Sequence, residues 1–169
     1  FDWAIVYNLG LVHLATGSFV SAFHQFSAAI NLNKTYPLLF MYLGVVLSYL
    51  NDFENGYVAL QRALQLQAKQ KIPNNKNMAA SELARQCLIH INCCIVLMRR
   101  VRDEHNELFE ADSKTFQFKD NSVPSFESGD EEQDEYHRYL FEEYTKHKQE
   151  AFQHWTSYQN MSKTVDDDT

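Results

Sequence analysis

The sequence predicts an all-α fold in which helical hairpins stack into a solenoid. The first observation is an internal repeat: YNLGLVHLATG aligns with MYLGVVLSYLN at a period of 34 residues, so that Gly10 recurs as Gly44. The second is a small residue 12 positions after each of these glycines, Ala22 in one copy and Gly56 in the other. The third is composition, because 45% hydrophobic residues with only three prolines and five glycines suit long uninterrupted helices.

This period and this placement of small residues are typical of the tetratricopeptide repeat (TPR), a helix-turn-helix unit that stacks into a right-handed superhelix. We expect one repeat at residues 3–36 and a second at residues 37–70. Gly17 and Asn51, one period apart, suit the tight turns between the two helices of each unit.

We expect each position that recurs between the two repeats to have a packing role. We expect Gly10 and Gly44 at the crossing of the first and second helix of a unit, where a missing side chain lets the backbones approach. Ala22 and Gly56 are the facing small residues, and Phe26 fills the space toward the next unit.

A third, degenerate repeat is expected at residues 87–161. INCCIVLM reads as its first helix and HKQEAFQHWTSY as its second, with Ala151 as the small residue and Trp155 as the large one. Cys94, in the place of Gly10, is 57 residues from Ala151 instead of 12, so this hairpin carries a long insertion at about residues 100–146. Residues 113–133 are acidic and poor in aliphatic side chains, which predicts a mobile loop.

Charge and hydropathy exclude several functional classes. The formal net charge is −7, but six acids lie in ESGDEEQDE and three more in residues 166–168, so the repeats are near neutral and offer no basic surface for nucleic acid. The sequence contains no apolar run of 18 residues, so it predicts no membrane-spanning helix. Because the chain begins inside a helix, we expect it to be part of a longer array.

The candidate chemical sites are weak. Cys87, His90 and Cys94 share one helix face at i, i+3 and i+7, but no fourth ligand or paired CxxC motif accompanies them, so packing roles are favoured over a metal site. Three cysteines without a spacing pattern also indicate a reducing compartment. His13 and His24 have no nucleophile or acid at a suggestive spacing. We therefore expect no metal, no cofactor and no enzymatic activity.

Binding is the remaining class, and in a TPR array the concave groove comes from the first helix of each unit. The expected groove residues are apolar and aromatic with two amides: Tyr7, Asn8, Leu11, Met41, Tyr42, Val45, Tyr49, Asn92 and Ile95. Such a surface suits an extended or helical peptide. The alternative is that these side chains only pack against neighbouring repeats. Asn8 matches the carboxylate clamp of chaperone-binding TPR domains, but Ala15 and Tyr49 stand where cations are needed, which argues against a co-chaperone.

FDWAIVYNLGLVHL, SAFHQFSAAIN and the later HKQEAFQHW resemble the C-terminal TPR repeats of the Bardet-Biedl syndrome 4 family. These proteins are TPR subunits of the BBSome, a coat-like complex that carries membrane proteins into and out of cilia. The resemblance implies a non-enzymatic scaffold that associates with other BBSome subunits, including a small extended subunit in the groove, and with centriolar satellite proteins. It implies a location in the cytoplasm, the cilium and the basal body, with membrane contact only through the complex. A generic peptide-binding TPR adaptor in a chaperone or cell-cycle complex stays open.

Overall fold

The computed structural model describes residues 2–70, 76–104 and 130–166, and these residues form six α-helices. The helices are α1 (Trp3–Ala15), α2 (Phe19–Leu32), α3 (Pro37–Tyr49), α4 (Phe53–Ala68), α5 (Lys76–Glu104) and α7 (Glu131–Asp166). None of the helices in these ranges combines the length and the apolarity needed to cross a membrane. The prediction of an all-α helical repeat is confirmed.

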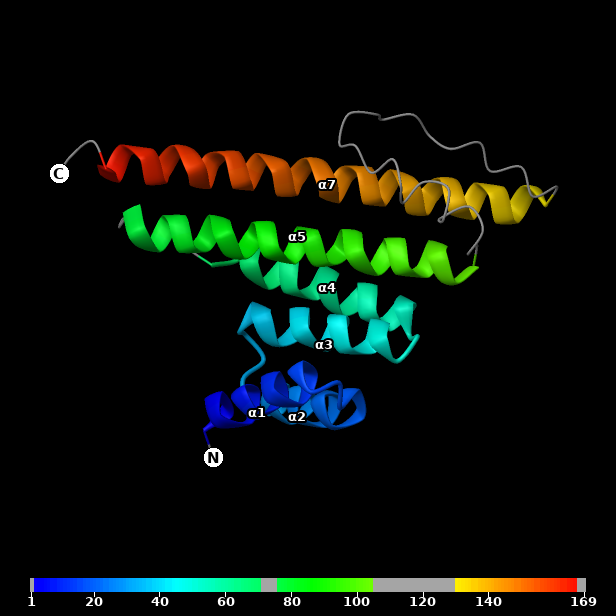
Figure 1. Ribbon diagram of the computed structural model, residues 1–169, viewed down its shortest axis with the longest axis horizontal. Helices are drawn as coiled ribbons and strands as arrows, with labels where there is room; N and C mark the ends of the chain where they lie inside the picture. The colour runs from blue at the N-terminus through cyan, green and yellow to red at the C-terminus, as the bar shows by residue number, and fades with distance from the viewer. Residues whose placement is uncertain (1, 71–75, 105–129, 167–169) are drawn as a thin grey trace.

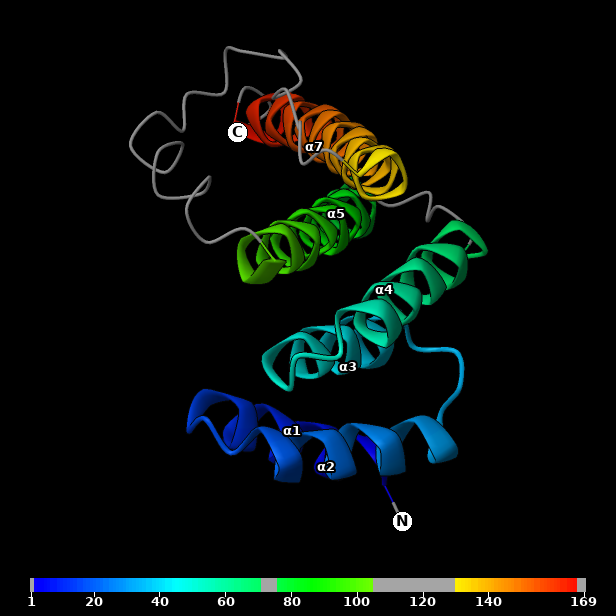
Figure 2. The same cartoon turned by 90° about the vertical axis from the view of Figure 1, so that its right-hand side faces the viewer.

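The helices pack as three successive antiparallel hairpins, α1 with α2, α3 with α4 and α5 with α7 (Figure 1). Neighbouring hairpins meet where α2 packs on α3 and where α4 packs on α5. The turned view shows the hairpins stacked in chain order, with α1 and α2 at one end and α7 at the other (Figure 2). Each hairpin therefore contacts mainly its neighbours in sequence, as in a solenoid.

The turns inside the first two hairpins are built alike. Gly17 and Asn51 both have a positive φ, 73° and 63°, and each follows the last turn of a first helix. The backbone N–H groups of Ser18 and Asp52 then donate to His13 and Leu47, at 2.8 and 2.9 Å. These bonds satisfy carbonyls at the helix end, so the turn residues expected from the sequence act as helix C-caps.

The close crossing of α3 and α4 depends on two glycines. A Cβ atom at Gly44 would lie 2.6 Å from the carbonyl oxygen of Gly56, and one at Gly56 would lie 2.9 Å from the carbonyl oxygen of Gly44. In the first hairpin a Cβ at Gly10 would lie 2.8 Å from the ring of Phe26. The glycines are therefore required by close approach, and Gly10 makes room for the Phe26 ring.

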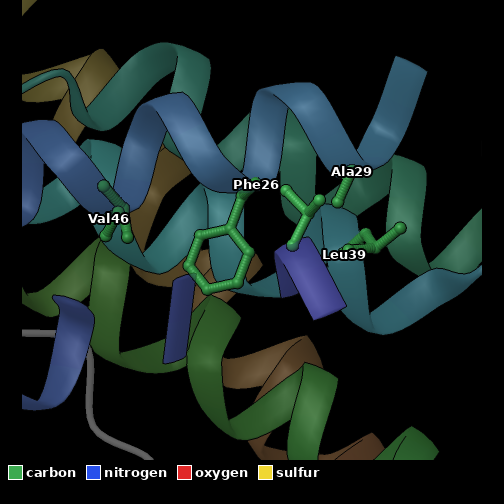
Figure 3. Close-up of a cluster of buried hydrophobic side chains, with 6 residues drawn as sticks. Phe26, Ala29, Leu39 and Val46 are labelled. Atoms are coloured by element: carbon green, nitrogen blue, oxygen red, sulfur yellow. The ribbon is translucent and has the colours of Figure 1, made fainter. Parts of the chain in front are cut away.

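The first hydrophobic core joins hairpins one and two. Phe26 and Ala29 of α2 lie against Leu39 and Val46 of α3, as Figure 3 shows. The Phe26 ring also stacks on the ring of Tyr42, with centroids 5.7 Å apart and planes 13° apart. Phe26 therefore packs toward the next hairpin, as the sequence predicts.

A second core joins hairpins two and three. Its fully or nearly fully buried side chains come from α3, α4 and α5, and they are Met41, Leu60, Ala63, Ile89, Cys93 and Val96. Met41 is only 1% exposed. Its assignment to the binding groove is therefore wrong, because a side chain enclosed between three helices cannot reach a partner.

The helices of the third hairpin are longer than the sequence suggests. α5 begins at Lys76, well before Cys87, and α7 begins at Glu131. The expected loop at residues 113–133 therefore ends earlier, because the Asp130 side chain accepts from the Glu132 N–H at 3.1 Å and its carbonyl accepts from Asp134 at 3.0 Å. Acidic residues in this first turn also favour the helix N-terminus. The remainder of that loop lies outside the described residues.

The pairing of α5 with α7 differs from the expected register. Ala151 is buried as expected, but its carbonyl faces Cys87, with the Sγ at 3.3 Å, while Cys94 Sγ faces the carbonyl of Tyr144 at 3.7 Å. The predicted Cys94–Ala151 crossing is therefore shifted by two helical turns. Trp155, expected as the large packing residue, is instead 46% exposed, and its ring stacks on that of Tyr158 on the same helix.

We predict that Gly44→Ala destabilises the protein by about 1–3 kcal/mol, because the added methyl overlaps the Gly56 carbonyl. The sign is diagnostic, since Gly→Ala inside an unobstructed helix stabilises by about 0.5–1 kcal/mol. Urea unfolding followed by circular dichroism measures the change, with Ser21→Ala on the exposed face of α2 as the control. A more stable Gly44→Ala variant would refute the close crossing.

We further predict that Phe26→Ala costs about 3–5 kcal/mol, because its fully buried ring joins two hairpins. The matched control is Phe152→Ala on α7, where the ring is 68% exposed and the change should stay within about 0.5 kcal/mol. Chemical denaturation of both variants tests the packing. Equal effects at the two positions would show that the inter-hairpin core is misassigned.

Candidate functional site

The expected groove residues come from α1, α3 and α5, and aromatic contacts connect these helices. The ring of Tyr7 on α1 lies 5.9 Å from that of Tyr42 on α3. At the C-terminal end of α3, the Arg99 guanidinium of α5 lies 4.0 Å from the centre of the Tyr49 ring. The structure therefore brings side chains from all three hairpins together along one seam.

Tyr7 and Tyr42 are half-buried and belong largely to the stack. The Tyr7 ring contacts the rings of Trp3, Phe26 and Tyr36 as well as that of Tyr42. Burial, followed by the neighbouring Tyr42 and Tyr36, raises the pKa of the Tyr7 hydroxyl above its usual range. For these two tyrosines the contacts favour the alternative role, packing against neighbouring repeats.

Tyr49 is more accessible and bridges all three hairpins. One face of its ring stacks on Phe19 of α2, with centroids 4.4 Å apart and planes 4° apart. Arg99 covers the ring from α5. Offset aromatic stacking and a cation–π contact each contribute on the order of 1 kcal/mol. Tyr49 therefore helps hold the hairpins in register while leaving part of its surface open.

The most accessible apolar part of the expected groove lies on α5. Ile95 is 45% exposed, and Leu88 and Ile91 are also exposed at i, i+3 and i+7 on the same helix face. Asn92, beside them, donates through Nδ2 to the carbonyl of Leu88 at 2.9 Å. This stripe offers a partner apolar contact next to a polar amide.

The remaining groove positions differ in their access to solvent. Asn8 on α1 is exposed, whereas Leu11 on α1 and Val45 on α3 are half-buried. Leu11 also packs against the first core. An open surface is therefore present at Asn8, at Tyr49 and along the α5 stripe.

A second group of functional interest lies between α4, α5 and α7, where polar side chains form a chain of hydrogen bonds. The Tyr57 hydroxyl donates to Glu143 Oε2 at 2.7 Å and lies 2.8 Å from His147 Nε2. His147 Nδ1 lies 2.9 Å from His90 Nδ1. We call Tyr57, His90, Glu143 and His147 the polar chain.

The direction of the hydrogen bonds in the polar chain follows from its chemistry. The single hydroxyl proton of Tyr57 goes to the Glu143 carboxylate, which only accepts when ionised. Tyr57 therefore accepts from His147 Nε2–H, which leaves Nδ1 of a neutral His147 as an acceptor. His90 then carries its proton on Nδ1 and donates it to His147, so that His90 Nε2 keeps a free lone pair.

Burial supports the neutral state of both rings. The pKa of His90 is lowered to about 4, mainly by desolvation and to a smaller extent by the nearby His147, His154 and Lys146. Desolvation also lowers the pKa of His147, although Glu143 opposes that shift. Both imidazoles are therefore neutral at pH 7, as the hydrogen-bond directions require.

The cysteines do not join His90 in a metal site. Cys87 and Cys94 Sγ point at carbonyls of α7, and the Cys93 side chain is enclosed in the second core. Burial raises the pKa of Cys94 to about 12 and also raises those of Cys87 and Cys93. The thiols therefore stay protonated at pH 7 and are poor nucleophiles.

His90 was among the candidate residues predicted from the sequence, whereas the residues that surround it were not. Glu143, His147, Glu150 and His154 follow one another at spacings of four, three and four residues, which places them on one face of α7. That spacing was visible in the sequence. Its significance was not, because the spacing alone does not reveal that this face of α7 packs against His90 of α5.

Comparison with known proteins shows one set of relatives. The chain is 46% identical over 74 residues to "BBSome complex member BBS4" of Xenopus tropicalis, a match that covers 44% of this chain and 14% of that protein. It is 50% identical over 66 residues to the mouse protein of the same name, covering 39% of this chain and 13% of the relative. No protein-family model matches the chain.

The same similarity extends to an insect. The Drosophila melanogaster "BBSome complex member BBS4 homolog" is 41% identical over 70 residues, covering 41% of this chain and 14% of the relative. The chain thus matches about one seventh of the length of these curated relatives. These matches confirm the resemblance noted in the sequence over the 66 to 74 residues of this chain that they cover.

We predict that Tyr57→Phe destabilises the protein by about 1–3 kcal/mol, because it leaves Glu143 and the His147 Nε2–H without their shared partner. Thermal and chemical unfolding measure the loss. Tyr139→Phe, which removes a hydroxyl from an exposed ring on α7, is the control and should change stability by no more than about 0.5 kcal/mol. If both variants unfold at the same denaturant concentration, the polar chain does not contribute to stability.

Proposed function

We propose that this chain is a non-enzymatic scaffold subunit of the BBSome that binds other subunits through its TPR surfaces. The observation that carries this proposal is the 41–50% identity to BBSome members from a frog, a mouse and a fly. Identity at that level over 66 to 74 residues spans about two repeat lengths and supports a shared architecture there.

The division into repeats at residues 3–36, 37–70 and 87–161 is part of the proposal. Stacked repeats present a long surface to which a partner segment binds along several units. The proposed partners are other BBSome subunits, among them a small extended subunit, and centriolar satellite proteins. The corresponding locations are the cytoplasm, the cilium and the basal body.

The surface that we assign to partner binding is the groove, with Met41 removed. Its accessible contacts are Asn8, Tyr49 and the α5 stripe of Leu88, Ile91 and Ile95. Exposed aliphatic and aromatic side chains beside an amide suit a segment held by apolar contact and a few hydrogen bonds. Arg99 is engaged with the Tyr49 ring, which supports contacts that are mainly apolar.

The absence of enzymatic activity is likewise proposed. Protonated, buried thiols and neutral histidines that hydrogen-bond to one another support packing and positioning roles. A scaffold role requires no catalysed reaction, because the assembly of subunits depends on the surface area they bury and on its complementarity.

We predict that Ile95→Asp reduces recovery of other BBSome subunits at least about tenfold, because it places a charge in the apolar stripe. Truncation of one interface hot spot costs about 2 kcal/mol or more, roughly a thirtyfold loss. The measurement is affinity purification from ciliated cells, quantified by mass spectrometry. Ile95 is half-exposed, so the fold should persist, and circular dichroism checks this.

The matched control is Val58→Asp, since Val58 is a β-branched residue on α4 with 57% exposure outside the groove. Recovery with Val58→Asp should equal that of the unmodified protein, and raising salt should have little effect on either, because apolar contacts are not screened. Equal loss from both variants would reject the groove. Purification of chaperone or cell-cycle subunits in place of BBSome subunits would support the generic TPR adaptor.

A further inference from the structure

Three side chains beyond the polar chain converge between α5 and α7. One donor atom from each of His90, Glu150 and His154 lies within 4.8 Å of the others. His154 Nε2 is 3.7 Å from Glu150 Oε2, and the rings of His90 and His154 stack with centroids 5.5 Å apart. The three residues come from two helices that run side by side along their length (Figure 1).

The donor types suit a divalent transition metal. Two imidazoles and one carboxylate are a ligand set that Zn²⁺ takes at bond lengths of about 2.0–2.2 Å, with water as a fourth ligand. A tetrahedral site with such bonds separates its donors by about 3.3 Å. Side-chain rotations that move the donor atoms by on the order of 1 Å would therefore bring them to the separation that Zn²⁺ requires. All three residues are partly exposed, which leaves room for a water ligand.

The polar chain orients one of these ligands in advance. Two Nδ1 atoms 2.9 Å apart cannot both carry a proton, and the hydrogen bonds from Tyr57 assign that proton to His90. His90 therefore donates through Nδ1 and keeps the lone pair of Nε2 for a ligand. Metal-binding histidines commonly donate their other N–H to a fixed acceptor, which here is His147.

We propose that His90, Glu150 and His154 bind one Zn²⁺-like ion, with His147 as a positioning residue. The ion would join the two helices of the third hairpin at a place separate from the groove. This site is distinct from the Cys87, His90 and Cys94 set considered from the sequence, because both thiols face carbonyls of α7. It shares with that set only His90.

The test is isothermal titration of Zn²⁺ into the purified, untagged protein. We expect one equivalent to bind, a melting temperature that rises with Zn²⁺ concentration, and no comparable effect of Mg²⁺, which disfavours imidazole. Glu150→Gln and His154→Gln change partly exposed side chains, so the fold should persist, and each should weaken binding at least about tenfold. His24→Gln and Glu142→Gln, at exposed positions outside the site, should leave the affinity unchanged.

Co²⁺ substitution separates this site from binding at the thiols. We expect weak visible bands of a nitrogen and oxygen ligand set, without a sulfur-to-cobalt charge-transfer band. Loss of those bands in His154→Gln, with their retention in Cys87→Ser, supports the proposal. A charge-transfer band that disappears in Cys87→Ser, failure of Zn²⁺ to bind, or unchanged affinity in both site variants would overturn it.

Discussion

The close approach of α3 and α4 at Gly44 and Gly56 is the constraint on which the rest of the stack depends. A single Cβ on either residue would meet the opposite backbone at 2.6 or 2.9 Å, so only two glycines permit this crossing. The crossing places Met41 and Leu60 on one side of the hairpin and Val46 on the other. The middle hairpin can therefore pack against a neighbour on both sides, which a solenoid requires.

The third hairpin solves the same packing problem differently. Its helices are 29 and 36 residues long. Part of the interface between them is made of polar side chains instead of apolar ones. The members of the polar chain satisfy one another's hydrogen-bonding groups. Such a network favours one register of α5 against α7, because a shift of one helix would leave its members unpaired. Residues Cys87 and Cys94, bonded to α7 carbonyls, are consistent with that register.

Packing and binding compete for the same aromatic side chains in this fold. Tyr7 and Tyr42 are half-buried because they close the space between hairpins, whereas Tyr49 contacts Phe19 and Arg99 and is still 44% exposed. The α5 stripe is exposed for a different reason, because the neighbouring Ile89, Cys93 and Val96 face α3 and α4 and leave Leu88, Ile91 and Ile95 on the open side of the helix.

The sequence by itself determined the repeat, because a 34-residue period of small and large residues is visible along the chain and is typical of stacked TPR hairpins. It also predicted the turns at Gly17 and Asn51 and the inward role of Phe26. The tertiary structure alone decided that Met41 is buried and that Trp155 is exposed. Periodicity identifies which face of a helix is apolar, but the register between two long helices depends on contacts between residues about 50 to 65 positions apart, as for Cys87 with Ala151. Such pairs leave no periodic trace in a single sequence, and for the same reason His90, Glu150 and His154 meet only in the folded protein.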